Sequence, residues 1–175
     1  MTEIHSRQGR PDDAERLAVL ARQTFVDTFV EGFGIPYPEA DLKAFLDKSF
    51  SVATTREDLE HPDRTWFVAE REGELLGFAT VGGCALPHPE ARPEHAELKR
   101  LYVSRAAQGL GVGTRLLALA MEAMDTRWGG PQWIGVWSGN LKAQKLYGAH
   151  GFQKAGEYDY PVGSWLDREF ILRKG

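Results

Sequence analysis

Residues 108–113, with the sequence Gln-Gly-Leu-Gly-Val-Gly, constrain the fold more than any other part of this chain. They follow residues 96–103, whose alternating apolar pattern predicts a strand, and they open residues 112–127, whose apolar spacing predicts a helix. A short apolar strand is predicted next, at residues 133–137. A strand, a helix and a second strand in this order predict a mixed α/β fold with one β-α-β crossover.

The other predicted elements fit around this crossover. The patterns predict strands at residues 2–6, 65–71, 75–83, 152–160 and 167–172, helices at 12–29, 39–50, 56–60 and 141–149, and loops at 31–38, 85–93 and 105–111. Asp12 is the expected cap of the first helix. A chain of 175 residues has the length of one domain, and it contains no repeat or linker, so we expect residues 1–175 to form a single domain.

Charge and composition exclude several classes of function. A net charge of −4 argues against a broad nucleic-acid-binding surface, although it suits a cationic small molecule. The longest apolar runs are shorter than the roughly 18 residues that span a bilayer, and no secretion signal is visible at the N-terminus, so we expect a cytoplasmic protein that does not bind membranes. The single cysteine, Cys84, excludes an internal disulfide.

The glycine segment predicts an anion-binding loop. Glycines let backbone N–H groups converge, and the start of a helix favours negative charge, so the ligand would be a phosphate or pyrophosphate. A dinucleotide fingerprint counted from Gly109 requires a glycine where the chain has Thr114, and a P-loop requires a Gly-Lys pair, which the chain lacks. A glycine-rich helix start with no ligand is the alternative interpretation.

A second motif lies downstream of the loop. It consists of Asn140, Ala143, Leu146, Tyr147, Gly151 and Phe152. With the strand and glycine loop before it, this arrangement resembles the GCN5-related N-acetyltransferase (GNAT) superfamily. Residues 23–29, 97–103 and 135–137 are similar to the subgroup of bacterial spermidine/spermine N-acetyltransferases. Two positions depart from the pattern: Gln108 stands where arginine is more frequent, and Leu146 where phenylalanine is common.

The resemblance implies a fold, a cosubstrate and a set of binding residues. The fold would be a mixed sheet of about seven strands, with helices on both faces and a splayed parallel strand pair at the acyl-CoA site. Acetyl-CoA would donate its acetyl group directly to a primary amine in a ternary complex; the amine would belong to a small molecule such as a polyamine or to a peptide N-terminus. The implied CoA-binding residues are Leu101, Tyr102, Val103, Gln108, Gly109, Leu110, Gly111, Val112, Gly113, Thr114, Asn140 and Tyr147.

The resemblance also implies catalytic roles. Tyr147 would be the general acid that protonates the departing thiolate, although a tyrosine on this helix also suits the core. Glu97 would be the general base, and its alternative is a strand carboxylate paired with Lys99 or Arg100. Asn140 would contact CoA or cap the following helix. A backbone N–H near Val103 would polarise the thioester carbonyl.

The acceptor site is expected from residues 31–38, the helix 39–50 and the loop 159–165. A polyamine would require converging carboxylates, for which the candidates are Glu31, Glu39, Asp41 and Asp159. Aromatic side chains would instead line an apolar pocket or simply pack, and these are Phe33, Tyr37, Tyr160 and Trp165.

Three further expectations complete the reading of the sequence. The five histidines form no i, i+3 or i+4 pair, so no metal is expected, and Cys84 is not favoured as a nucleophile. Dimers are common in the superfamily, so a homodimer is one expected assembly. The competing function is a non-catalytic acyl-CoA-binding module on the same fold.

Overall fold

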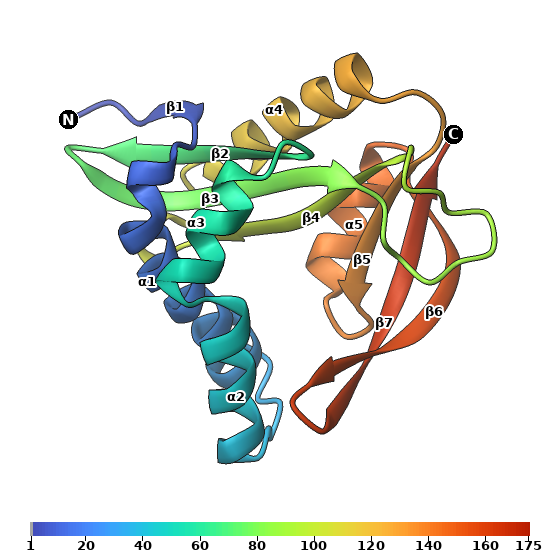
Figure 1. Cartoon of the computed structure of the whole chain (residues 1–175), viewed down its shortest axis with the longest axis horizontal. Coiled ribbons are helices and arrows are strands. Elements are labelled where there is room, and N and C mark those ends of the chain that lie inside the picture. The colour runs from blue at the N-terminus through green and yellow to red at the C-terminus, as the bar shows by residue number, and fades with distance from the viewer. Residues whose placement is uncertain (1) are drawn as a thin grey trace.

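The computed structural model describes residues 2–175, within which seven strands form one mixed sheet. The order across the sheet is β1-β2-β3-β4-β5-β7-β6, and only β4 and β5 are parallel among its neighbouring pairs (Figure 1). The strands are β1 (His5–Gln8), β2 (Arg64–Arg71), β3 (Glu74–Gly83), β4 (Ala96–Val103), β5 (Gln132–Trp137), β6 (Gln153–Val162) and β7 (Trp165–Lys174). The predicted mixed sheet of about seven strands is therefore confirmed.

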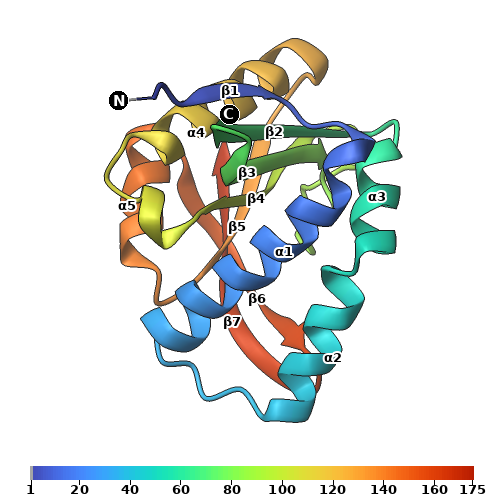
Figure 2. The same cartoon turned by 90° about the vertical axis from the view of Figure 1, so that its left-hand side faces the viewer.

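Helices cover both faces of the sheet, as expected (Figure 2). One face carries α1 (Ala14–Phe25), α2 (Glu39–Ser49) and α3 (Val52–Glu60), and the other carries α4 (Val112–Arg127) and α5 (Leu141–Ala149). Alternate residues of a strand point to opposite faces, so Phe78 of β3 joins the α1–α2 core and Ala79 joins the α4–α5 core. The sheet thus separates two apolar cores.

The parallel pair β4 and β5 stays together for only part of its length. The register pairs residues Ala96, Glu97 and Leu98 with Gln132, Trp133 and Ile134. Beyond these residues β4 continues to Val103 and β5 to Trp137 without pairing, and the two strands diverge in Figure 1. The splay implied by the resemblance is confirmed, and it leaves an opening through the middle of the sheet.

The first predicted helix is wrong at both ends. A short 3-10 turn (Pro11–Asp13) precedes α1, and a wider π-helical turn (Val26–Gly32) follows it, so the predicted loop at residues 31–38 begins only after that turn. Asp13, rather than Asp12, holds the backbone at this corner: its Oδ2 accepts the Arg10 N–H at 2.8 Å. The buried Asp13 carboxylate also pairs with Arg7 and Arg16, which explains why the chain turns there.

Other boundaries differ for local reasons. The third helix is α3 and starts at Val52 instead of residue 56, because the Ser51 side chain accepts the Thr54 N–H at 3.1 Å and caps it. The first strand begins at His5 instead of residue 2, where it pairs with β2. The predicted loop at residues 159–165 is instead a hairpin, since β6 runs to Val162 and β7 starts at Trp165. No helix within residues 2–175 is long and apolar enough to cross a membrane.

Candidate active site

The glycine loop has the geometry of an anion cradle. Gly109 and Gly111 have φ angles of +80° and +79°, in the left-handed region that glycine adopts most readily. A Cβ atom at either position would meet nothing within 4 Å, so the loop backbone is open to a ligand. Gly111 is also the residue before α4, and no side chain caps this helix start. The first N–H groups of a 16-residue helix therefore face the cradle with the positive end of the helix dipole.

One cavity of about 790 Å³ connects this cradle with the splayed strands. Its wall includes the free stretch of β4, the end of β5 and parts of the helices on both faces of the sheet. Tyr147, on the wall, belongs to the α4–α5 core, whereas Phe25 and Phe45, also on the wall, belong to the α1–α2 core. The cavity thus reaches both faces of the sheet through the gap between β4 and β5.

All but one of the residues expected to bind acyl-CoA lie on this wall. The wall contains Leu101, Tyr102, Val103, Gln108, Gly109, Gly111, Val112, Gly113, Thr114, Asn140 and Tyr147. Leu110 is absent from it and its side chain is half exposed. The role of Leu110 in binding acyl-CoA stays a prediction.

Tyr147 is a buried phenol on α5 that faces the cavity. Burial raises its pKa well above the ordinary value of a tyrosine, so the hydroxyl keeps its proton at neutral pH and is able to donate it. Asn140 caps α5, because its Oδ1 accepts the Ala143 N–H at 3.1 Å. This capping role was one of its two expected roles.

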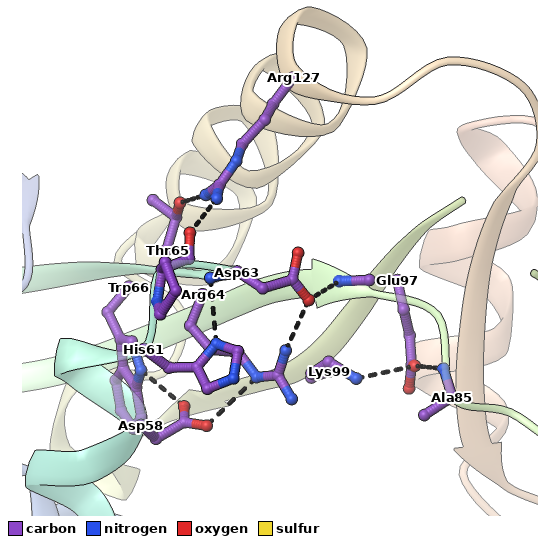
Figure 3. A network of polar contacts seen from close by, with 12 residues as sticks. Asp58, His61, Asp63, Arg64, Thr65, Trp66, Ala85, Glu97, Lys99 and Arg127 are labelled. Carbon is purple, nitrogen blue, oxygen red and sulfur yellow. Dashed lines mark hydrogen bonds and ion pairs between the residues drawn. The ribbon is translucent and has the colours of Figure 1, made fainter. Parts of the chain in front are cut away.

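Glu97 lies on β4 with one carboxylate oxygen already engaged. Figure 3 shows that Oε2 accepts hydrogen bonds from Lys99 Nζ at 3.0 Å and from the Ala85 N–H at 2.9 Å. The pair with Lys99 is the structural alternative that the sequence suggested for this residue. Glu97 nevertheless lies on the cavity wall, so its role as a base stays a prediction.

The same close view shows how the strands beside Glu97 are fixed (Figure 3). Asp58 of α3 accepts hydrogen bonds from Arg64 and Trp66 of β2, at 3.2 and 2.8 Å. Asp63 accepts the Gly83 N–H at the end of β3, at 2.9 Å. These bonds hold α3, β2 and β3 together at the edge from which β4 returns.

The end of the cavity on the α1–α2 side is aromatic. Phe33, Tyr37 and Tyr160 line it as expected, and Trp165 packs against the Tyr37 ring at 5.9 Å between centroids. Sequence reasoning missed the other aromatic wall residues on this side, which are Phe25, Phe29, Phe45, Phe50, Trp137 and Tyr158. The helical spacing of the phenylalanines indicated a core, and nothing in that spacing distinguishes a core from a pocket wall.

The four acids proposed for a polyamine do not converge. Glu31 pairs with Arg105 at 3.0 Å, and Asp159 lies 3.6 Å from Arg168. Asp41 accepts the backbone N–H and the hydroxyl of Ser164, and Glu39 is exposed on α2. Because the wall contains none of the four, this expectation fails for the described cavity.

Instead, the structure brings Asp167 and Glu169 of β7 to the cavity, and sequence reasoning missed both. They are two residues apart in a strand, so they share a face of the sheet. Asp167 accepts hydrogen bonds from the Tyr37 hydroxyl and from Trp165 Nε1 at 2.9 Å. Burial, and to a smaller degree the charge of Asp167, raises the pKa of Glu169 to about 8. The alternation was visible in the sequence, but which face meets a cavity was not.

The sequence did not favour Cys84 as a nucleophile, nor did it favour a metal site. Burial raises the pKa of the Cys84 thiol to about 11, which keeps it protonated and poorly nucleophilic at neutral pH. Within residues 2–175, no group of three or more His, Cys, Asp or Glu side chains is placed to hold a metal ion.

This architecture defines a class of protein. It is the class of enzymes that bring an anionic cosubstrate and a second substrate together across a sheet. A family model described as the Acetyltransferase (GNAT) family matches residues 22–152, which is more than half of the chain. The chain therefore belongs to the GNAT family, and it is an acyltransferase.

Relatives cover the whole chain at low identity. An uncharacterized N-acetyltransferase of Lactobacillus delbrueckii subsp. lactis is 25% identical over 175 residues, which span 99% of this chain and 98% of the relative. The crystal structure of a PaiA N-acetyltransferase from Thermoplasma acidophilum in complex with coenzyme A has a TM-score of 0.73 at 21% identity and covers 98% of both chains. This structural likeness confirms the fold.

The polyamine subgroup rests on a shorter match. The spermine/spermidine N(1)-acetyltransferase of Bacillus subtilis is 27% identical over 90 residues, which span 51% of this chain and 59% of the relative. The superfamily is thus confirmed, whereas the subgroup stays a prediction.

Proposed function

We propose that this protein transfers an acetyl group from acetyl-CoA to a primary amine while both are bound in the cavity. The observation that carries the proposal is the continuous cavity through the gap between β4 and β5. It has the cradle and Tyr147 on one face of the sheet and an aromatic pocket on the other, so two substrates can meet without a covalent enzyme intermediate.

The residues present fit the cosubstrate. The open backbone of Gly109 and Gly111 and the uncapped start of α4 suit a pyrophosphate. The unpaired edge of β4 at Leu101 and Val103 suits the amides of a pantetheine arm, since both kinds of group form strand-like hydrogen bonds. When bound there, acetyl-CoA supplies an activated thioester. The Val103 N–H is our proposed donor to the thioester carbonyl.

Tyr147 is the proposed general acid. It lies on the cavity wall beside the free stretch of β4, and its raised pKa keeps the proton on the phenol at neutral pH, where the departing thiolate would take it. The acceptor enters from the aromatic side and must lose a proton before its nitrogen can attack. Glu97, the base predicted from the motif, and Glu169 are the two glutamates on the wall that compete for this role.

A thiol-release assay tests the proposal. Acetyl-CoA is supplied with a panel of monoamines, polyamines, aminoglycosides, amino acids and short peptides, and the free CoA thiol is measured. We expect release with at least one amine and a loss of about 10²- to 10⁴-fold in kcat for Tyr147→Phe. CoA affinity measured by calorimetry is the control, and in Tyr147→Phe it should fall far less than kcat does. Tight CoA binding with no thiol release from any acceptor would instead support the non-catalytic module.

A further inference from the structure

Glu169 occupies a central place in the aromatic half of the cavity. It lies on β7 and pairs across the sheet with Trp137, the last residue of β5, at the end where β5 has left β4. Its side chain is partly buried and lies on the cavity wall. The residue is thus on the α1–α2 side of the opening, across the sheet from Tyr147.

Glu169 is also the acid on this wall that has no assigned partner. Glu97 accepts from Lys99 and from Ala85, and Asp167 accepts from Tyr37 and Trp165. Asp27 accepts from Gln23 Nε2 at 2.8 Å and lies 3.8 Å from Arg105. Within residues 2–175, the Glu169 carboxyl group has no hydrogen-bond or ion-pair partner, although its backbone pairs with β5 and β6 in the sheet. A buried carboxylate without a partner is costly, so a position that keeps one facing a cavity is suited to a cationic ligand.

Four phenols surround this carboxyl group. The charge of Glu169 acts on the titration of Tyr37, Tyr102, Tyr158 and Tyr160, which come from the loop before α2, from β4 and from β6. Burial raises the pKa of each, so all four remain neutral at physiological pH. Neutral aromatic rings around one carboxylate attract an ammonium group and hold the carbon chain attached to it.

From this arrangement we infer that Glu169 binds the ammonium group of the acceptor and takes its proton, and that the acceptor is a compact primary amine with one positive charge on an aliphatic or aromatic body. The inference deepens the proposed function and rests on it for the chemistry. In the step itself, the Glu169 carboxylate accepts one proton from R–NH₃⁺ to give the carboxylic acid and R–NH₂. The nitrogen keeps its freed electron pair for attack, and Glu169 later returns the proton to water.

The charges on the wall favour a monoamine over a polyamine. A polyamine carries several ammonium groups spaced along its chain, and each requires its own acid. Glu169 is one unpartnered acid, whereas Lys99 and Arg100 add positive charge to the same wall. The Arg100 guanidinium stacks on the Phe50 ring at 4.6 Å, where it repels a second ammonium group.

Proton release on binding tests the inference in the CoA-free protein. Because the pKa of Glu169 is raised to about 8, roughly nine tenths of this group is protonated at pH 7 in the free protein. Binding of an ammonium group must then expel nearly one proton, which calorimetry detects as a binding heat that depends on the buffer. The charged and titratable groups that share the wall around Glu169 are Tyr37, Arg100, Tyr102, Tyr158, Tyr160 and Asp167.

The probes are 2-phenylethylamine, n-hexylamine and spermidine, titrated into four proteins at pH 7. For the wild type we expect a monoamine to bind more tightly than spermidine and to release about one proton. Glu169→Gln should bind that monoamine about 10- to 100-fold more weakly and release no proton, as the loss of a charge-assisted bond implies. Glu97→Gln should keep the proton release. Glu157→Gln, a surface carboxylate of β6 off the cavity wall, is the matched control.

Each outcome decides the inference separately from the proposed function. Unchanged affinity and proton release in Glu169→Gln overturn it, as does their loss in Glu97→Gln alone. Failure of both monoamines to bind, or tighter binding of spermidine, overturns the acceptor class. If Glu169-dependent binding occurs but no acceptor ever releases thiol from acetyl-CoA, the binding assignment stands and the proposed function fails. If thiol release occurs and is the same in Glu169→Gln as in the wild type, the proposed function stands and the assignment of Glu169 fails.

Discussion

Replacing Glu169 with glutamine should stabilise the protein at alkaline pH. The pKa of the folded-state carboxyl group is raised from 4.5 to about 8, so folding favours its neutral form. Between these pH values the unfolded chain loses a proton that the folded chain keeps, and stability therefore falls by about 1.4 kcal/mol per pH unit and levels off above pH 8. The full difference would be roughly 5 kcal/mol. Water that reaches the open cavity screens the charge, so we expect about 3 kcal/mol.

Urea denaturation followed by tryptophan fluorescence measures this effect at pH 5, 7 and 9. Glu169→Gln should match the wild type within about 1 kcal/mol at pH 5 and exceed it by about 3 kcal/mol at pH 9. Glu97→Gln provides the comparison: it leaves Lys99 without its partner, so it should be less stable than the wild type at pH 9 by about 1–3 kcal/mol. Equal stability of Glu169→Gln and wild type at pH 9, or an advantage that shrinks as pH rises, refutes the reasoning.

Four further outcomes follow from the structure. Gly111→Ala should cost about 1–2 kcal/mol in urea denaturation and weaken CoA binding in calorimetry, because its φ of +79° is strained for alanine. Asp13→Asn should cost about 3 kcal/mol at pH 7. The partners of Asp13 hold the pKa of this carboxyl group far below the ordinary value. The free energy of unfolding that the charged carboxylate contributes is therefore present above about pH 4 and is lost as the pH falls further, so the variant should approach the wild type in acid. Cys84 should react with iodoacetamide at pH 8 only after unfolding, since its thiol is buried and protonated; rapid labelling of the native protein would contradict this. Tyr147→Phe should leave the thermal midpoint within a few degrees of wild type while thiol release is lost, because the hydroxyl has an apolar surrounding and no bond within residues 2–175 depends on it.

Local pattern was enough to predict β4, α4 and α5 around the crossover. The strand Ala96–Val103 and the helices Val112–Arg127 and Leu141–Ala149 have the predicted bounds, because their periodicity, glycine ends and caps all agree. At the N-terminus the buried Asp13 moved the boundary, since its three donors come from residues before and after it in the chain. Arg7 also pairs with Glu70 of β2, and an ion-pair cluster that depends on such a distant residue is not visible in a local pattern. The same is true of the β6–β7 hairpin, whose strands extend each other past the predicted ends.

The sequence predicted the cosubstrate half of the site, and for the acceptor half it predicted the segments but not the acids. Backbone N–H groups at Gly109 and Gly111 would bind through chain geometry, and chain geometry leaves a glycine pattern in the sequence. The proposed acceptor pocket consists of side chains from α1, α2, β6, β7 and the loop before α2, which meet where the sheet opens between β4 and β5. The sequence did not single out Glu169, because acidic residues are common on the solvent-facing side of an alternating strand.

The opening in the sheet and the unpartnered Glu169 share one physical property: each leaves a polar group without a protein partner. Pairing that stops at Leu98 leaves the edge of β4 free, and a free strand edge inside a protein is costly unless a ligand completes its hydrogen bonds. A carboxylate held at about pKa 8 beside the same gap is costly in its charged form for the same reason. We expect both costs to fall further when the substrates bind, since the cosubstrate would complete the strand edge and the ammonium group of the acceptor would neutralise Glu169. The stability lost at the β4 edge and at Glu169 would therefore be recovered as binding energy where the acetyl group must pass. For this reason we expect Glu169→Gln to be more stable than the wild type and to bind the acceptor more weakly.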